Sequence, residues 1–263
     1  MIEFHQAAAA IYLATGIAAL VGIVLPAPRL ARWSLVGLVF GAVLQGLGFA
    51  TLHRTASAPP LTDPTSVAAL VVWMTVLCLL FFSRRMRVTS LVAVVSFIAF
   101  LVVFASLLRP TTSIDPSAAL TGTWPHAHVL LASAGLAFMS VAGLAGIFYL
   151  VEHRRLKSKR ALRPRFRGPS LEALDQINAV ALAVGFPLLT LGVVTGMIWQ
   201  HSVHGVLWTA NAHETWTFVS WVIYAALVLV RFVGHQGARQ AAATAVAGFA
   251  FLTFAVVGVG AFQ

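Results

Sequence analysis

Histidine is the side chain in this sequence whose number and placement most suggest chemistry. The chain holds nine histidines but only seven aspartates and glutamates together, and it has a single cysteine, Cys78. One cysteine cannot form an intrachain disulfide, a CxxC redox pair or a CxxCH attachment site. Neutral imidazole is a common ligand of metal ions, so the histidines point to a metal or to a metal-centred ligand.

A zinc site is one reading of these histidines. His201 and His204 have the i, i+3 spacing of a zinc-binding pair, and Glu214 follows them in the sequence. The sequence has no HExxH motif, however, and we expect the segment around this pair to be a loop. Zinc therefore remains an alternative to a larger ligand.

The elements that carry the histidines must be membrane helices. The chain of 263 residues is 60% hydrophobic and 9% charged, with a mean hydropathy of +0.92. Soluble chains hold about 45–50% apolar and about 25% charged residues. This composition excludes a cytosolic enzyme, a disulfide scaffold and a disordered regulator. Because alternating strands for a barrel are absent, we expect an all-α, polytopic transmembrane helix bundle.

Eight apolar runs predict the helices, since a bilayer core needs about 20 apolar residues per helix. We expect a single integral membrane domain, residues 1–263, with spans at roughly 7–24, 32–51, 66–82, 88–108, 129–151, 177–199, 215–233 and 241–262. No Lys or Arg precedes the first span, so we expect a retained helix rather than a signal peptide. Small residues predict close helix packing; they are Gly192 and Gly196 of the sixth span and Ala132, Gly135, Ala142, Gly143 and Gly146 of the fifth.

The basic residues predict the orientation. All but two of the 17 lysines and arginines fall in alternate loops, which the positive-inside rule assigns to the cytoplasm, so both termini should face outward. The net charge of +10 is then a topology signal and not a nucleic-acid signal. In the basic cytoplasmic loop 152–176, the run 153–167 lies against anionic lipid or docks a soluble partner. We expect a multi-pass protein of a bacterial inner membrane.

This topology gathers most of the histidines and several tryptophans at the outer face. The histidines are His5, His53, His126, His128, His201, His204 and His213, and the tryptophans are Trp124, Trp199, Trp208 and Trp216. An aromatic belt is the ordinary reason for such tryptophans. Imidazoles and aromatic rings together also suit haem, whose iron takes a neutral imidazole and whose macrocycle packs on aromatic faces. Arg54 and Arg109, the two outward basic residues, either contact the haem propionates or extend to the head groups.

Several segments resemble one family of membrane proteins. They are GFPLLTLGVVTGMIW (185–199), HGVLWTANAHETW (204–216), HETWTFVSWVIYAALVLVR (213–231), WPHAHVLLASAGLAF with FYLVEHRRLKSK in the fifth span, and the stretch 43–73. They resemble the haem-handling cytochrome c assembly family of CcsA-, CcmC- and HemX-type proteins, over about residues 34–261. The tryptophan-rich outer loop, 200–214 with the start of the next helix, resembles a degenerate form of the family's WWD motif, WGxxWxWDxxETW. Gly205, Trp208, Glu214, Thr215 and Trp216 match that motif, whereas His204, Ala210 and Asn211 replace a Trp, a Trp and the Asp.

The resemblance implies non-covalent haem b near the outer leaflet, with His128 as an axial ligand of the haem iron. Candidates for the opposing ligand are His53, His204 and His213, with His5 weaker, and Trp124, Trp199, Trp208 and Trp216 are candidates to line the pocket. The chain departs from the family at two intramembrane haem-ligand positions, which hold Gln45 and about Leu229 here. The second external histidine has no clear counterpart.

We therefore expect a non-enzymatic protein that handles haem for cytochrome c assembly or reports haem status to tetrapyrrole synthesis. Its partners would be proteins of those pathways, docking through the basic run 153–167. One alternative is a structural subunit of a larger membrane complex that kept the fold and lost the haem site. Another is a membrane transporter or haem-modifying enzyme, although no carboxylate lies in the middle of a span, where proton coupling would need one.

Overall fold

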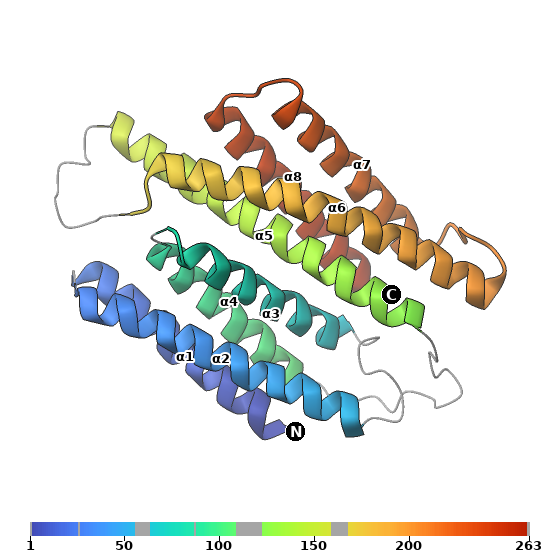
Figure 1. The fold of residues 1–263 in the computed structure, drawn as a ribbon, viewed down its shortest axis with the longest axis horizontal. Helices are drawn as coiled ribbons and strands as arrows, with labels where there is room; N and C mark the ends of the chain where they lie inside the picture. The colour runs from blue at the N-terminus through green and yellow to red at the C-terminus, as the bar shows by residue number, and fades with distance from the viewer. Residues whose placement is uncertain are drawn as a thin grey trace. The chain divides into compact units, whose positions relative to one another are not determined.

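The structure is a computed structural model that describes residues 2–25, 27–55, 64–86, 88–108, 123–158 and 168–261. Within these ranges the chain forms helices and no strands (Figure 1). The helices are α1 (Ile2–Val24), α2 (Pro28–Thr55), α3 (Pro64–Ser83), α4 (Thr89–Leu108), α5 (Thr123–Lys157), α6 (Leu171–His204), α7 (Ala212–Phe232) and α8 (Ala238–Ala261). The predicted all-α fold is confirmed.

Length and composition make α1 to α7 suitable for crossing a membrane. Each holds an 18-residue window that is strongly apolar on average and has at most two charged side chains. At 1.5 Å per residue such a helix crosses most of a bilayer core of about 30 Å. The eighth predicted span, 241–262, lies in α8 up to Ala261, and its passage through the membrane stays a prediction.

The helices extend beyond the predicted spans where polar residues continue the helical hydrogen bonding. The fifth span was predicted to begin at residue 129, but α5 begins at Thr123. The sixth was predicted at 177–199, whereas α6 runs from Leu171 to His204. These boundaries matter because they place His128, His201 and His204 on helices.

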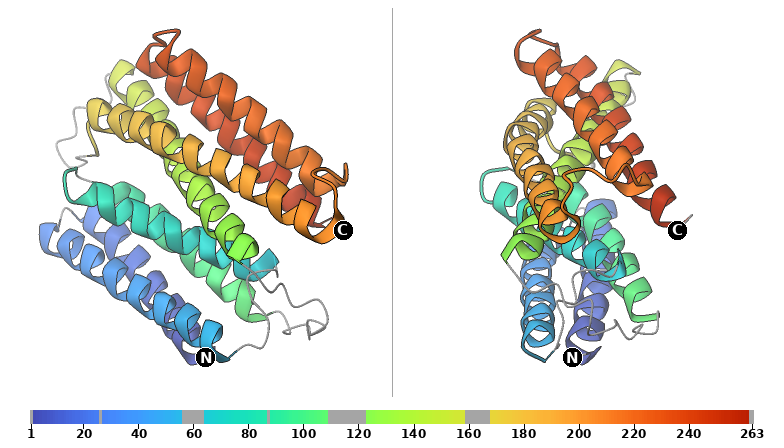
Figure 2. Two further views of the ribbon diagram at one scale, coloured as in Figure 1. Left: turned by 45° about the vertical axis from the view of Figure 1, so that its right-hand side comes forward. Right: turned by 90° about the vertical axis from the view of Figure 1, so that its right-hand side faces the viewer.

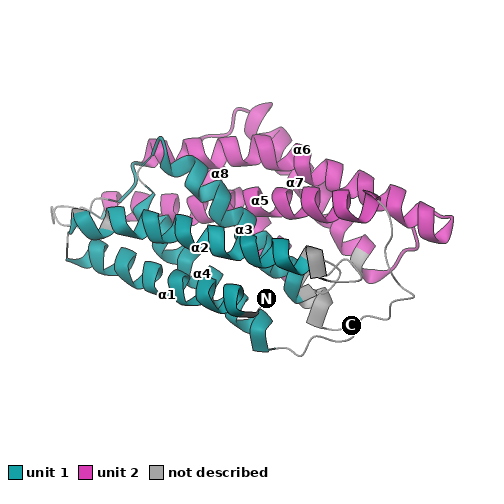
Figure 3. Cartoon of the chain, turned by 60° about the horizontal axis from the view of Figure 1, so that its bottom comes forward, with its two compact units in different colours: residues 1–121, 158–170 teal, residues 122–157, 171–263 magenta. Residues whose placement is uncertain are grey.

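The chain divides into two compact units, residues 1–121 with 158–170 and residues 122–157 with 171–263 (Figure 3). In the first unit, α1 packs against α2 and α4, and glycines allow the close approach of α1 to its neighbours. A Cβ on Gly41 of α2 would lie 2.6 Å from the ring of Tyr12, and one on Gly16 would lie 3.2 Å from Phe97 of α4. The first unit is therefore a helix bundle in which small residues let neighbouring helices pack closely.

The second unit is built on the pair α5 and α6, which run side by side, with α8 against α5 and α7 against α8 (Figures 1 and 2). A Cβ on Gly135 of α5 would come 2.7 Å from the backbone nitrogen of Leu189. One on Gly146 would come 2.7 Å from the carbonyl oxygen of Ala242 in α8. The predicted role of the small residues in close helix packing is confirmed, because any larger residue would push these backbones apart.

Candidate functional site

His128 lies in the second turn of α5 and bonds across to α6. Its Nδ1 is 2.7 Å from the carbonyl oxygen of Gly192. A carbonyl oxygen can only accept a hydrogen bond, so the neutral ring must carry its proton on Nδ1 and donate it there. The lone pair is then on Nε2. Metal-ligating histidines show this arrangement, with one ring N–H given to a backbone carbonyl or a carboxylate and the other nitrogen on the metal.

Two glycines on one stripe of α6 form the seat for His128. A Cβ on Gly196 would lie 2.7 Å from Nδ1 and 2.8 Å from Cε1 of the imidazole. A Cβ on Gly192 would lie 2.9 Å from the backbone of Ala132, one turn further along α5. The Thr195 hydroxyl also donates to the Gly192 carbonyl, at 3.0 Å. The imidazole is therefore held in place by the shape of α6 as well as by the hydrogen bond.

Trp199 also lies beside the imidazole. Its ring centroid lies 5.9 Å from that of His128, with the two planes inclined at 41°. Gly192, Gly196 and Trp199 recur at intervals of four and three residues, so they share one face of α6. The structure therefore brings together two residues that the sequence singled out, His128 and Trp199.

The segment after Trp199 is helical for longer than predicted, so the predicted loop 200–214 is too long. His201 and His204 are exposed on the last turn of α6. The helix ends at Gly205, whose φ of +73° is left-handed and whose N–H bonds to the carbonyl oxygen of His201 at 2.9 Å. This left-handed glycine directly after the last helical residue, His204, is the usual end of a helix.

The short connection to α7 is folded around the carboxylate of Glu214. That carboxylate accepts hydrogen bonds from the backbone N–H and the hydroxyl of Thr209, both at 2.7 Å, and from the Asn211 side-chain amide at 3.1 Å. Asn211 in turn accepts from the Glu214 N–H and caps α7. Gln200 on α6 donates to the Thr209 hydroxyl at 3.3 Å. Glu214 therefore works as a structural group that shapes this loop.

The other candidate tryptophans have different neighbours. Trp208 packs edge-on against Phe218, with ring centroids 5.6 Å apart. Trp216 packs against Phe251 and Phe254 of α8, at 6.0 and 5.9 Å. Trp124 is 44% exposed in the first turn of α5. Exposed aromatic side chains of this kind suit a membrane interface and a planar apolar ligand equally well.

Several predicted site residues fall where the structure describes no side chain. The backbones of His53 and Arg54 lie in α2 and that of His213 in α7, but their side chains are outside the described part. Arg109 lies outside the described residues altogether. His5 is described, and it packs edge-on against Phe49 with centroids 5.3 Å apart. The proposed opposing ligand and the propionate contacts thus stay predictions.

The position where the resemblance places an intramembrane ligand is occupied by a paired amide. Gln45 of α2 is completely buried. Its Oε1 accepts from the Tyr12 hydroxyl of α1 at 2.9 Å, and its Nε2 donates to the Ala69 carbonyl of α3 at 3.0 Å. Gln45 thus links three helices of the first unit. Leu229, at the other such position, is 60% exposed on α7.

Among the residues that the structure describes, no three His, Cys, Asp or Glu side chains come together as a metal site. A structural zinc ion needs four protein ligands and a catalytic one three. The zinc reading of His201 and His204 gains no support from this part of the chain. A ligand that needs one or two imidazoles and apolar walls suits the described residues better.

Sequence reasoning missed how the site is held. It treated Gly192 and Gly196 as packing residues, and their role in seating His128 follows only from the pairing of α5 with α6. It also missed an ion pair that joins α7 to α6. Nη2 of Arg231 lies 2.7 Å from Oδ1 of Asp175. In the sequence, the only signal for that pair was one acid near the start of a span and one base near the end of the next.

The fold and the histidine seat define a multi-pass helical membrane protein with a partly exposed imidazole near the end of two long helices. Comparison with known proteins gives its family: residues 63–263, more than half of the chain, match the family described as cytochrome C assembly protein. The chain belongs to the cytochrome c assembly protein family.

Individual relatives agree with this assignment. The chain is 24% identical over 219 residues to the cytochrome c biogenesis protein CcsA of Guillardia theta, an alignment that covers 76% of this chain and 73% of the relative. It is 42% identical over 89 residues to CcsA of a Prochlorococcus marinus strain, covering 34% of this chain and 28% of the relative. It is 35% identical over 107 residues to CcsA of a Picosynechococcus strain, covering 40% and 31%. The two cyanobacterial alignments thus span less than a third of those relatives.

Proposed function

We propose that this protein binds haem b as cargo for cytochrome c assembly, with Nε2 of His128 as an axial ligand of the haem iron. The observation that carries the proposal is the hydrogen bond from His128 Nδ1 to the Gly192 carbonyl. It fixes the tautomer that leaves a lone pair on Nε2, and it fixes the plane of the ring. A backbone carbonyl partner of this kind also raises the basicity of the ligating nitrogen.

The rest of the described site is compatible with a flat, apolar and anionic ligand. Trp199 beside His128 offers an aromatic wall, and the exposed rings of Trp208 and Trp216 offer further apolar surface. When bound, haem supplies an iron centre that accepts imidazole nitrogen, together with two carboxylates that arginines could pair with. Arg54 and Arg109 are the residues we propose for that pairing. In this role the chain holds and hands over haem, and its own residues form no covalent bond.

The names of the relatives support the assembly role. CcsA proteins of algae and cyanobacteria are named cytochrome c biogenesis proteins. We propose that the present chain lies in a bacterial inner membrane with the His128 end of α5 outward, as its basic loops predict. The basic run 153–167 would then face the cytoplasm, where it could dock a protein of haem supply or tetrapyrrole synthesis.

A second candidate function rests on Gln45. The amide holds three helices together through two buried hydrogen bonds at a position where the resemblance expects a haem-ligating histidine. This favours a chain that kept the fold and serves as a structural subunit of a larger membrane complex. The two proposals differ in whether the protein itself binds haem.

An absorbance spectrum separates them. The full chain would be purified in mild detergent after expression with haem supplied, alongside His128→Ala and the control His126→Ala on the same helix. The haem proposal expects a Soret band in the wild type and the control that is lost or shifted in His128→Ala. A wild-type protein without a Soret band that co-purifies with a stable partner supports the structural subunit. A band that is the same in all three proteins contradicts the role of His128.

A further inference from the structure

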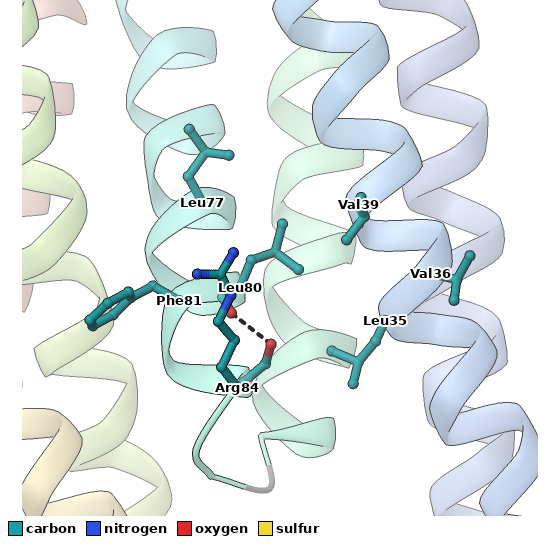
Figure 4. Close-up of a pocket in the computed structure, with 8 residues that line it drawn as sticks. Leu35, Val36, Val39, Leu77, Leu80, Phe81 and Arg84 are labelled. Atoms are coloured by element: carbon teal, nitrogen blue, oxygen red, sulfur yellow. Dashed lines mark hydrogen bonds between the residues drawn. The ribbon is translucent and has the colours of Figure 1, made fainter.

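The first unit contains a groove that is lined only by residues of α2, of α3 and of the turn after α3. It lies between α2 and α3 and has a volume of about 450 Å³, and Figure 4 shows the residues that line it. Most of its lining is aliphatic or aromatic; the lining residues are Leu35, Val36, Val39, Leu77, Leu80, Phe81, Ser83 and Arg84. The only hydroxyl among them is already used, because Ser83 Oγ donates to the Leu80 carbonyl at 2.7 Å.

The groove carries one charged group, Arg84, at the point where α3 ends. Figure 4 shows its side chain directed back along α3, with the guanidinium beside Leu80. No carboxylate in the described part of the chain forms an ion pair with it. Arg32 lies one turn before Val36 on α2, which places a second cation on the same helix face at the same end. The groove is therefore lined mostly by apolar side chains, with two arginines at the end where α2 begins and α3 ends.

Its position relative to the membrane is set by the apolar spans. The stretches that qualify as membrane spans are Arg32–Leu52 in α2 and Thr65–Ser83 in α3. The apolar lining thus lies near the start of the α2 span and near the end of the α3 span, and Arg84 follows directly after the α3 span. Trp33, which is 69% exposed at the same end of α2, marks head-group level. The positive-inside rule assigns this end to the cytoplasmic leaflet, which carries the anionic lipids.

We propose that this groove binds one anionic phospholipid, with an acyl chain between α2 and α3 and the phosphate against Arg84 and Arg32. Basic pockets between transmembrane helices on the cytoplasmic side are known sites for anionic head groups. Apolar walls match the acyl chain, and the Arg84 guanidinium, which forms no ion pair with a carboxylate of the described residues, matches the phosphate with two parallel hydrogen bonds. None of the lining residues is a histidine, cysteine, methionine or tyrosine, so the groove offers haem iron no axial ligand.

The test is a lipid titration of the delipidated full chain in detergent, followed by native mass spectrometry. The probes are phosphatidylglycerol and phosphatidylcholine with identical acyl chains. The variants are Arg84→Gln, Val39→Trp to fill the groove, and the matched control Arg85→Gln, an exposed arginine next in sequence that does not line it. Arg84→Lys asks whether charge alone restores binding.

The wild type should bind one phosphatidylglycerol about 25-fold more tightly than phosphatidylcholine, about fivefold for each of the two arginines near the head group. Arg84→Gln should reduce that preference to about fivefold, Arg84→Lys should restore part of the loss, and Arg85→Gln should leave the preference in place. Val39→Trp should weaken both lipids. Equal affinity for the two lipids, equal losses in Arg84→Gln and Arg85→Gln, or unaltered binding in Val39→Trp would each overturn the proposal.

Discussion

Replacement of Gly196 by alanine should disturb the protein first at His128. The three nearest atoms to a Cβ at position 196 are all in the His128 ring, the closest being Nδ1 at 2.7 Å. Ordinary contacts begin at 3.4 Å, so the ring must retreat by about 0.7 Å. A shift of that size along the bond to the Gly192 carbonyl would stretch 2.7 Å to about 3.4 Å, outside the usual hydrogen-bond range.

The expected change in stability follows from three contributions. Loss of the hydrogen bond costs about 0.5–1.5 kcal/mol, and overpacking of the helix interface costs about 1–3 kcal/mol. Alanine favours the helix over glycine by about 0.5–1 kcal/mol, which offsets part of the cost. We expect Gly196→Ala to lower the free energy of unfolding by about 1–3 kcal/mol. If His128 binds haem, affinity should also fall by about 10–100-fold, as for other residues that orient a metal ligand.

Thermal unfolding in detergent and haem titration at the Soret band measure the two effects. The decisive comparison is Gly196→Ala in a His128→Ala background, where the added methyl group meets no imidazole. There the alanine should be neutral or stabilising, because only its helix propensity remains. Gly237→Ala, whose Cβ would meet nothing within 4 Å, is the control and should change little. Equal destabilisation by Gly196→Ala in both backgrounds would refute the seat described for His128.

Three further substitutions test other parts of the structure. Gln45→Leu should lower the free energy of unfolding by about 2–4 kcal/mol, because the Tyr12 hydroxyl and the Ala69 carbonyl lose their buried partner. Adding Tyr12→Phe should recover part of that loss in thermal unfolding. No recovery would contradict the hydrogen bond between Tyr12 and Gln45. Asp175→Asn should lower the free energy of unfolding by about 1–2 kcal/mol, a value reduced for the partial exposure of the carboxylate. The same change should cost much less in a protein that already carries Arg231→Gln, because the ion pair is then absent. Equal losses in both backgrounds would mean that the two residues are not coupled. Glu214→Gln should leave the melting temperature nearly unchanged but speed amide hydrogen exchange in the loop between α6 and α7, whereas unchanged exchange would show that the carboxylate does not hold that loop.

The membrane helices could be predicted from the sequence because bilayer thickness fixes the length of an apolar run. The helix ends could not, because polar residues such as His201, Ser202 and His204 continue backbone hydrogen bonding past the apolar stretch. Only the left-handed turn at Gly205 stops α6. A lone glycine is too common a signal to locate that end from sequence.

The sequence could name His128 as a candidate ligand, but it could not predict which groups hold the imidazole. A family pattern singles out His128, since the residues around it resemble the family's helix. Its hydrogen-bond acceptor, the Gly192 carbonyl, lies 64 residues away on another helix. A backbone carbonyl has no sequence signature, and only the pairing of α5 with α6 brings it to the imidazole. Likewise, the sequence shows that Gln45 is not histidine but not that it joins three helices.

The central claim is that Nε2 of His128 is a haem ligand. Its most direct test is the Soret spectrum of His128→Gly, purified with haem supplied and measured with and without added imidazole. The account predicts that the band is lost or shifted in the variant and that imidazole restores the wild-type spectrum, because the small molecule can enter the space that the side chain leaves. A variant spectrum identical to that of the wild type, with no response to imidazole, would contradict it.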